Sequence, residues 1–307
     1  MAVAPSAIWL FVARALDGIT AGNIPVIFAV IADTTKPEER PRAFGMIGSA
    51  FSFGFIFGPA IAAFTVGLGT AVPFVIAGII TSVAVALTYL YLPETNAHLG
   101  EVKHGKLFDF AKMWQTLFDK NVGRTFMITL IYFMAFACAL MYGYQPFTLN
   151  VLHITSAQNA QFFTLFGVVG LISQNLLVHR ITKKLGTAHS FTLGMLFTSV
   201  SLLIMFVSRS LPIFLLGSVL LGIANSVVQT LIPSILSREA DAKSQGTIMG
   251  LNSSYQSIGM IVGPVLGGLV ATVAIPLPFA TGAGLILICV WLSYGVMRRG
   301  VRPESAF

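Results

Sequence analysis

Nine long apolar stretches run through the chain and constrain its fold more than any other feature. A helix needs about 20 residues to cross the hydrocarbon core of a bilayer. Only 9% of the residues are charged, against about a quarter in soluble proteins. The stretches lack the alternating ten-residue segments of a membrane β-barrel, so we expect an all-α membrane protein. They cover residues 8–32, 43–66, 72–92, 125–149, 160–178, 189–207, 212–236, 247–273 and 276–297.

The basic residues are distributed unevenly between the two ends of these stretches. Of the 18 Lys and Arg residues, sixteen fall on the side that holds the C-terminus, Arg209 falls on the other, and Arg14 lies within a stretch. Positive charge gathers in cytoplasmic loops, so we expect a cytoplasmic C-terminus and an outside Met1. A net charge of +7 could suggest nucleic acid, but this placement argues against it. The start, "MAVAPSAIWLF", has no basic region like that of a signal peptide.

Two of the stretches repeat one another at an offset of 205 residues. "GFIFGPAIAA" begins at Gly54, and "GMIVGPVLGG" begins at Gly259. Each copy follows a charged turn, so the sequence and its orientation repeat together. Parallel repeats of this kind are one way of building a transporter. Four stretches precede the second copy and one follows it, which makes a unit of six. Only one precedes the first copy, so we expect three further helices upstream, absent from this chain.

Further motifs appear in a fixed order. "FVARALDGITAGN" holds Arg14 and Gly18, "IADTTKPEERPRAFG" forms a charged turn, and "YLPET" covers 91–95. With the Gly-Pro repeat, these motifs resemble the major facilitator superfamily, and within it the twelve-helix drug:proton antiporters that include the tetracycline efflux pumps. The resemblance covers nearly the whole chain and implies a major facilitator helical bundle with nine of its twelve helices. It divides the chain into a partial N-terminal half (1–92), a cytoplasmic linker (93–124) and a C-terminal six-helix half (125–307).

One family motif departs from its usual form. The basic turn of the second half reads "NLLVHRITKK". Arg180, Lys183 and Lys184 are kept, while His179 stands where the family has Asp. The resemblance therefore does not imply the part of the gating contact that depends on that Asp.

Several charged residues are candidates for proton coupling or gating. Arg14 matches the family's membrane Arg, and Asp17 lies three residues on, on a neighbouring position of the same helix; either a structural ion pair or a role in coupling would explain them. Asp33 matches an acid that meets the first basic turn in the family. In the second half, Glu239 or Asp241 could pair with Arg180. For all three acids, a solvated loop charge is the alternative.

Glycine and proline are candidates for shaping a central cavity. Small residues four apart let helices approach closely, and proline kinks a helix. Ordinary helix packing is the alternative, but the repeat favours a bent helix in each half. These candidates are Gly18, Gly54, Gly58, Pro59, Gly259, Gly263 and Pro264.

Polar side chains inside apolar stretches are candidates for substrate binding, because they need partners or water. Hydrogen bonding between helices is the alternative for each. The candidates are Asn23, Tyr142, Gln145, Gln174, Asn225, Gln229, Asn252 and Tyr255. In the linker, "KLFDFAKMWQTLFDK" has apolar residues at helical spacing, which indicates an interfacial amphipathic helix or, alternatively, a protein-docking helix.

Sequence signals of enzymes and metal sites are missing. The five histidines lie in or beside loops, and there is no HExxH, GxSxG or Walker motif. Cys138 and Cys289 lie within stretches and have no metal-type spacing. We therefore expect no enzymatic activity, no catalytic residues, no cofactor and no metal.

The sequence thus predicts a monomeric multi-pass transporter of the bacterial inner membrane, which exports a small apolar or amphipathic compound such as an antibiotic by proton antiport and alternating access. Substrate would bind near the midplane between the halves. An uptake symporter of the same superfamily is the first alternative. A non-transporting truncated product is the second.

Overall fold

The computed structural model describes Ala2 and residues 4–20, 23–35, 40–69, 71–95, 110–120, 122–239 and 245–297. Over these ranges the backbone forms helices and connecting turns, with no β-strand. The predicted all-α class is confirmed. Asp241, Arg298 and Arg299 lie outside the described residues, as do residues 96–109 and 121 of the linker.

The helices follow one another with short connections. They are α1 (Ala7–Thr20), α2 (Asn23–Thr34), α3 (Arg40–Thr65), the 3₁₀ turn η1 (Val66–Leu68), α4 (Val72–Tyr91), α5 (Phe110–Leu117), α6 (Gly123–Phe136), the π-helix η2 (Ala137–Gly143), α7 (Tyr144–Asn150), α8 (Ser156–Ile172), the π-helix η3 (Ser173–Leu177), α9 (Val178–Leu185), α10 (Thr187–Val207), α11 (Leu211–Glu239), α12 (Gln245–Ala271) and α13 (Leu277–Met297).

Seven helical runs among the described residues are long and apolar enough to cross a membrane. They start with α4 and, from Gly123 onward, match the predicted stretches closely. They are Val72–Tyr91, Gly123–Asn150, Thr164–Leu185, Thr187–Val207, Leu211–Glu239, Thr247–Ala271 and Leu277–Gly295. Helix α3 also covers the second predicted stretch, although its apolar part, Ser49–Ala62, is shorter.

The first predicted stretch, 8–32, is not described as one helix. Helix α1 ends at Thr20 and α2 begins at Asn23, with Ala21 and Gly22 outside the described residues. Pro25 is unfavourable in a single continuous helix over this stretch. It has no backbone N–H, and in a continuous helix its ring would meet the carbonyl group of Ala21, four residues earlier.

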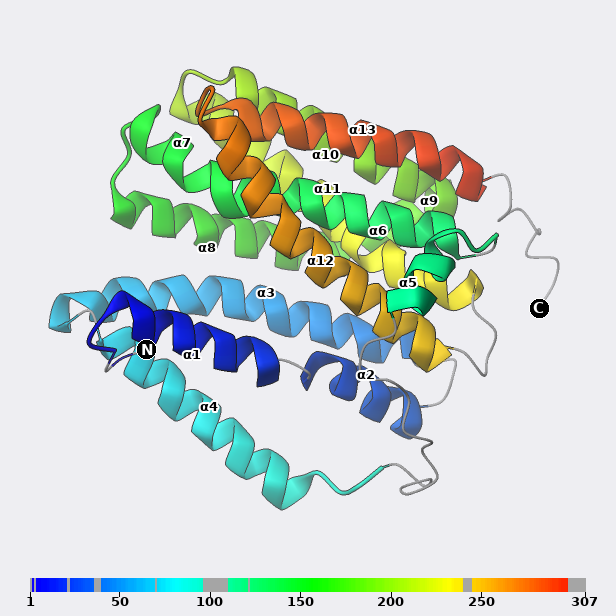
Figure 1. Ribbon diagram of the computed structural model, residues 1–307, viewed down its shortest axis with the longest axis horizontal. Helices are drawn as coiled ribbons and strands as arrows, with labels where there is room; N and C mark the ends of the chain where they lie inside the picture. Colours follow the sequence, from blue (N-terminus) through cyan, green and yellow to red (C-terminus); the bar gives the residue numbers. More distant parts are fainter. Residues whose placement is uncertain are drawn as a thin grey trace.

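The described helices form two groups that lie side by side (Figure 1). Helices α6–α13 pack into one bundle, and α1–α4 lie along one side of it. Helix α3 runs against α8, its most extensive contact, and also meets η3 and α11, while α2 touches α12. These contacts form the boundary between the two groups.

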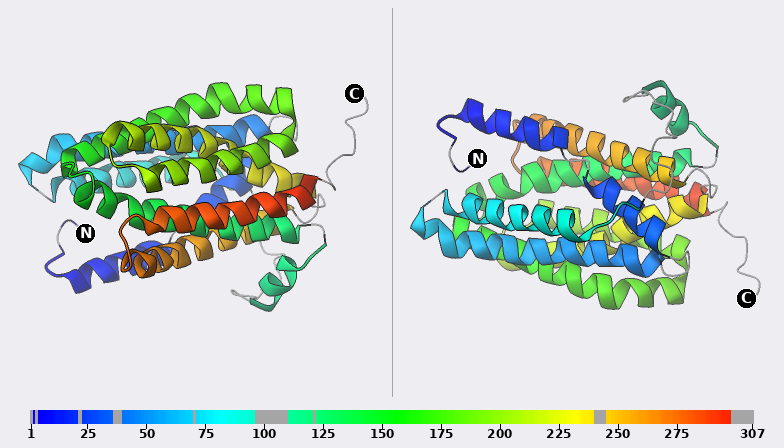
Figure 2. Two further views of the ribbon diagram at one scale, coloured as in Figure 1. Left: turned by 90° about the horizontal axis from the view of Figure 1, so that it is seen from above. Right: turned by 90° about the horizontal axis from the view of Figure 1, so that it is seen from below.

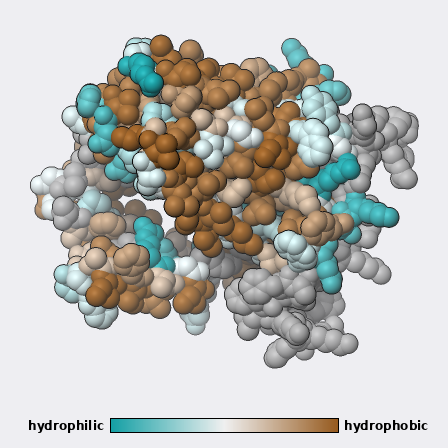
Figure 3. Space-filling view, turned by 45° about the horizontal axis from the view of Figure 1, so that its top comes forward, coloured by the Kyte–Doolittle hydropathy of each residue, from teal (hydrophilic) through white to brown (hydrophobic). Residues whose placement is uncertain are grey.

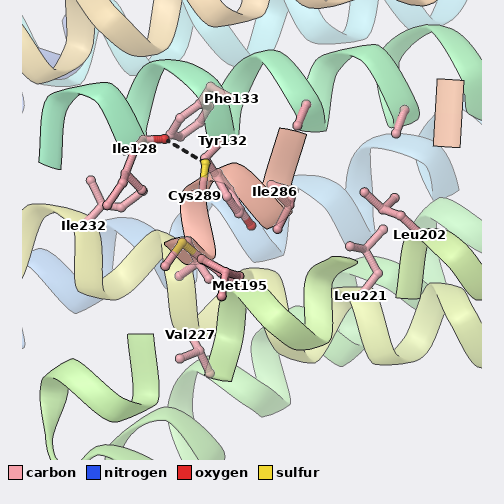
Figure 4. Packing of buried hydrophobic residues seen from close by; sticks show 14 of the residues in the cluster. Ile128, Tyr132, Phe133, Met195, Leu202, Leu221, Val227, Ile232, Ile286 and Cys289 are labelled. Atoms are coloured by element: carbon pink, nitrogen blue, oxygen red, sulfur yellow. Dashed lines mark hydrogen bonds between the residues drawn. The ribbon is translucent and has the colours of Figure 1, made fainter. Parts of the chain in front are cut away.

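The hydrophobic core lies within the C-terminal group. Its buried residues come from α6, η2, α7 and α9–α13 and include Phe126, Met195, Leu221 and Ile286. Cys289 lies against α6, with its Sγ 3.8 Å from the carbonyl oxygen of Ile128 (Figure 4).

The outer surface is also apolar, as expected of helices that face lipid. Hydrophobic side chains cover most of the face drawn in Figure 3, and hydrophilic ones lie mainly toward its edges. A soluble protein rarely exposes so large a contiguous apolar area. The protein is therefore a multi-pass membrane protein.

Two of the spanning runs contain a π-helical segment. Segment η2 interrupts Gly123–Asn150 and η3 interrupts Thr164–Leu185. Pro146 lies just after η2 and cannot donate a hydrogen bond to Tyr142, four residues before it, which favours a widened turn there. For η3 the neighbouring residues offer no comparable cause. Such π segments are rare and often lie at functional sites.

Candidate functional site

Polar side chains at the two π segments are the first part of the candidate site. Tyr142 belongs to η2, and Gln145 is in the first turn of α7, immediately after it. Both are exposed. The ring of Tyr142 lies along α12, because a Cβ added at Gly268 would be 3.5 Å from its Cε2. The structure therefore places both exposed side chains at the π segment of an apolar helix.

Gln174, in η3, is part of a second polar group. Its amide Nε2 donates a hydrogen bond to Thr230 Oγ1 of α11 at 3.0 Å. Gln174 and Gln229 are both half-buried. Helix α3 contacts both η3 and α11, so this group lies on the elements that meet the N-terminal helices.

A row of hydroxyl groups on α6 binds the polar residues of α11 and α12. Thr125 donates a hydrogen bond to Glu239 Oε2 at 2.8 Å, and Thr129 donates one to Asn252 Oδ1 at 3.1 Å. One turn further, the Tyr132 hydroxyl donates to Asn225 at 2.8 Å.

The three donors Thr125, Thr129 and Tyr132 are fully buried. Polar groups removed from water in this way need such partners. The row therefore ties three helices together inside the C-terminal group.

Asn252 and Tyr255 lie inside this packing. Both are buried, and the Tyr255 hydroxyl donates to the carbonyl oxygen of Met113 at 2.6 Å. As described, each is engaged between helices, whereas Asn225 is only half-buried. Asn23, at the start of α2, is exposed.

The two glycine-proline copies have different surroundings. In α12, a Cβ added at Gly259 would lie 2.7 Å from the Leu130 carbonyl oxygen, and one at Gly263 would lie 2.5 Å from the Met134 carbonyl oxygen. These glycines let α12 approach α6 directly. In α3, an added Cβ at Gly54 or at Gly58 would meet nothing within 4 Å among the described atoms.

The remaining candidates for shaping a cavity are two prolines and Gly18. Pro59 and Pro264 lie inside α3 and α12. Gly18, in α1, has open space around it within the described part of the chain.

Arg14 and Asp17 form an ion pair on α1. Their Nη1 and Oδ2 atoms are 3.3 Å apart, and the two side chains are 69% and 65% exposed. Arg14 thus uses the nearest acid on its own helix.

Only some of the gating candidates lie among the described residues. The side chain of Asp33 and the whole of Asp241 lie outside the described residues. Arg180 is exposed on α9, and Glu239 accepts the hydrogen bond from Thr125. The contact between Arg180 and an acid stays a prediction.

Sequence reasoning missed the donors of these hydrogen bonds. Thr125, Thr129 and Tyr132 recur at intervals of four and three residues, which puts them on one face of α6. That spacing was the available signal. Thr230, the partner of Gln174, has no comparable pattern.

A recess between α8 and α11 is a weaker candidate for a binding site. It measures about 190 Å³ including space open to solvent, and Phe162, Phe166 and Leu215 contribute to its apolar lining. Pockets for drug-sized ligands usually have about 300–1,000 Å³. Among the described residues, no group of three His, Cys, Asp or Glu side chains could hold a metal ion.

Comparison with known proteins identifies the family. The model of the Major Facilitator Superfamily matches residues 1–189 and, in a second match, residues 175–306. The chain belongs to the major facilitator superfamily. The members of this superfamily are membrane transporters of small molecules, not enzymes.

Similar proteins include bacterial resistance proteins. The chain is 29% identical to Multidrug resistance protein 1 of Bacillus subtilis (strain 168) over 299 residues, which cover 92% of this chain and 73% of that protein. It is 26% identical to the class G tetracycline resistance protein of Vibrio anguillarum, covering 86% of this chain and 67% of that protein.

A solved structure has the same fold. The crystal structure of the human organic anion transporter MFSD10 (TETRAN) superposes with a TM-score of 0.80 at 23% sequence identity. The match covers 95% of this chain and 72% of that one. The predicted major facilitator bundle is confirmed.

Proposed function

We propose that this transporter exports small apolar or amphipathic compounds, drugs among them, in exchange for protons. Export proceeds by alternating access, in which the groups α1–α4 and α6–α13 move relative to one another. The contacts of α3 with α8 and α11, and of α2 with α12, are where this movement takes place.

The observation that carries the proposal is the set of polar groups at the π segments of two apolar helices. Tyr142 and Gln145 accompany η2, and Gln174 lies in η3. A few polar groups in an apolar wall suit compounds that are mainly apolar but have one or two polar atoms. Relatives named for multidrug and tetracycline resistance support the same substrate class.

We assign proton coupling and gating to charged residues that are not among the polar groups at η2 and η3. Arg14 and Asp17 are the pair that responds to protons within the N-terminal group. Gating takes place at the end of the molecule where α2 ends and α12 begins. The residues assigned to it are Asp33, Arg180 and Glu239. The repeated Gly-Pro pairs bend α3 and α12 around the substrate.

The proposed membrane and orientation rest on the relatives and on the charge distribution. Similar bacterial proteins favour the bacterial inner membrane. The excess of basic residues on the side of the C-terminus favours a cytoplasmic C-terminus. We propose that the protein works as a monomer.

Everted membrane vesicles from cells that express the chain test the direction and the coupling together. With the interior acidified, ethidium or tetracycline should accumulate inside the vesicles, and a protonophore should abolish the accumulation. Vesicles from cells with an empty vector are the control. Proton-driven entry of either compound into right-side-out vesicles would instead establish uptake, and the absence of movement in both preparations would refute transport of these compounds.

A further inference from the structure

Helix α5 is fixed to the bundle by its inner face. Met113 and Leu117 pack against the hydrophobic core, and the buried Tyr255 hydroxyl binds the Met113 carbonyl oxygen at 2.6 Å. The turn into α6 is equally close, because a Cβ at Gly123 would overlap the carbonyl oxygen of Leu117. Helix α5 is therefore an integral part of the C-terminal group.

Two exposed aromatic side chains lie on the outer face of α5 and just after its last residue. Trp114, in α5, is 66% exposed, and Phe118, the residue that follows Leu117, is 63% exposed. Their rings meet edge to face, with centroids 5.4 Å apart. The pair leaves a large apolar area uncovered by any described part of the chain.

Two cations follow this aromatic pair in the sequence, within six residues of Phe118. Lys120 and Arg124 are both exposed. Arg124 lies against the end of α13, because a Cβ added at Gly295 would overlap its guanidinium group. The one described acid in this segment, Asp119, directly precedes Lys120 and accepts a hydrogen bond from the backbone N–H of Val122 at 3.1 Å. The described charged residues that follow the aromatic pair are therefore two cations and one acid.

The position of α5 places this face at the level of a membrane surface. Phe118 is five residues before the spanning run that begins at Gly123. In Figure 2, α5 projects sideways from the bundle at the end where α6 begins and α13 ends. A helix beside the ends of spanning helices meets the lipid headgroups, where tryptophan is enriched.

We propose that α5 is a binding site for anionic phospholipid, with Trp114 and Phe118 inserted among the upper acyl chains and with Lys120 and Arg124 binding the phosphate. Basic residues beside an amphipathic helix recognise anionic lipid in this way. A soluble protein partner is less suitable, because it would have to displace headgroups to reach the aromatic pair. The inference rests on the membrane location and is independent of the transported compound.

Fluorescence of Trp114 tests the insertion. The full chain with Trp9→Phe and Trp291→Phe, in nanodiscs, has Trp114 as its sole tryptophan. Phospholipids brominated near the headgroup should quench it at least twofold more than phospholipids brominated deep in the chain. A variant that keeps only Trp291, which is 72% exposed on α13, is the control for lipid contact within a span.

Lipid charge and point variants test the headgroup contact. Quenching of Trp114 by brominated lipid should be stronger in nanodiscs that contain phosphatidylglycerol than in nanodiscs of pure phosphatidylcholine, and the ratio of the two measures the lipid preference. Lys120→Gln and Arg124→Gln should each reduce this preference about fivefold, as expected for one interfacial charge. Lys184→Gln, a cation on α9, should leave it unchanged. Tyr255→Phe should keep the preference but make Trp114 more accessible to acrylamide, because α5 loses its tie to α12.

Three results would overturn the proposal. Trp114 quenched by acrylamide equally in nanodiscs and in detergent would show that it faces water. Protection from both acrylamide and brominated lipid would show that protein covers it. Loss of the lipid preference in the presence of millimolar inorganic phosphate would show a site for a free anion rather than for lipid.

Discussion

Arg14 and Asp17 place two opposite charges one turn apart in a stretch of α1 that is otherwise apolar. A charge at the centre of a bilayer costs about 2.5–3.5 kcal/mol on insertion scales, so the pair is retained either for structure or for coupling. The 3.3 Å contact between them fits both roles. Single and double substitutions distinguish the two.

If Arg14 organises the proton pathway, Arg14→Ala should reduce drug-driven proton release by about tenfold or more, equivalent to about 1.4 kcal/mol, while some drug binding remains. Arg14→Lys should lose part of the activity, because it keeps the charge but not the planar group. Proton release is measured in proteoliposomes at matched protein amounts. Normal release by Arg14→Ala would exclude the coupling role.

The structural role makes a different prediction. Arg14→Ala and Asp17→Asn would each lower expression, because each leaves one charge without its partner, and the double substitution would restore part of it. The amount of protein in the membrane fraction is the measurement.

Asn252 and Gln145 allow packing to be separated from transport. Asn252→Ala removes the buried acceptor for Thr129, and should destabilise the protein by about 0.6–1.7 kcal/mol, seen as a lower midpoint of thermal unfolding. Gln145→Ala, at an exposed position, should leave unfolding unchanged and lower drug export. The opposite pattern would reverse the assignment of these two residues.

The Gly-Pro helices α3 and α12 have the same sequence pattern but unequal surroundings. Gly263→Ala should overlap the backbone of α6 and η2 and cost about 1–3 kcal/mol. Gly58→Ala is the matched control and should be nearly neutral, because an added Cβ meets open space. Equal thermal shifts in the two variants would contradict the close contact at Gly263.

The prolines of the same two helices are predicted to act on transport. Pro59→Ala and Pro264→Ala should each keep membrane insertion but reduce export, because we propose that each proline bends its helix at the substrate. Neither side chain can carry a proton, so a loss must come from shape. The measurement is export at equal expression, and full activity in both single variants and in the double variant would rule out this role.

Helix α4 and the spanning helices of the C-terminal group were predictable from the sequence, because each requires only a long apolar run. The first predicted stretch, 8–32, is described as two separate helices, α1 and α2, and Pro25 is a local signal against one continuous helix. The π segments were not predicted, although Pro146 is a local signal for η2; η3 has no comparable signal in the sequence. The partners of Asn225 and Asn252 could not be predicted, since they lie about 90 and 120 residues away on another helix, and hydrophobic periodicity says nothing about which helices become neighbours.

At the scale of the whole molecule, the distribution of basic residues makes the orientation testable. Cys138 and Cys289 are buried, so cysteines introduced at exposed sites should dominate labelling. Ser210→Cys, in the turn between α10 and α11, should react in intact cells with a thiol reagent that does not cross membranes. Lys184→Cys, on α9, should react only after the cells are opened. The reverse pattern would place the C-terminus outside.

Helix α4 has a consequence for how this protein is made. Its apolar run of 20 residues contains no residue that is buried by the described part of the chain, so the helix does not depend on packing against those residues. In membranes a helix can form first and associate later. During synthesis, α4 leaves the ribosome before any part of the core formed by α6–α13. It must therefore be stable in the bilayer as a helix before that core exists.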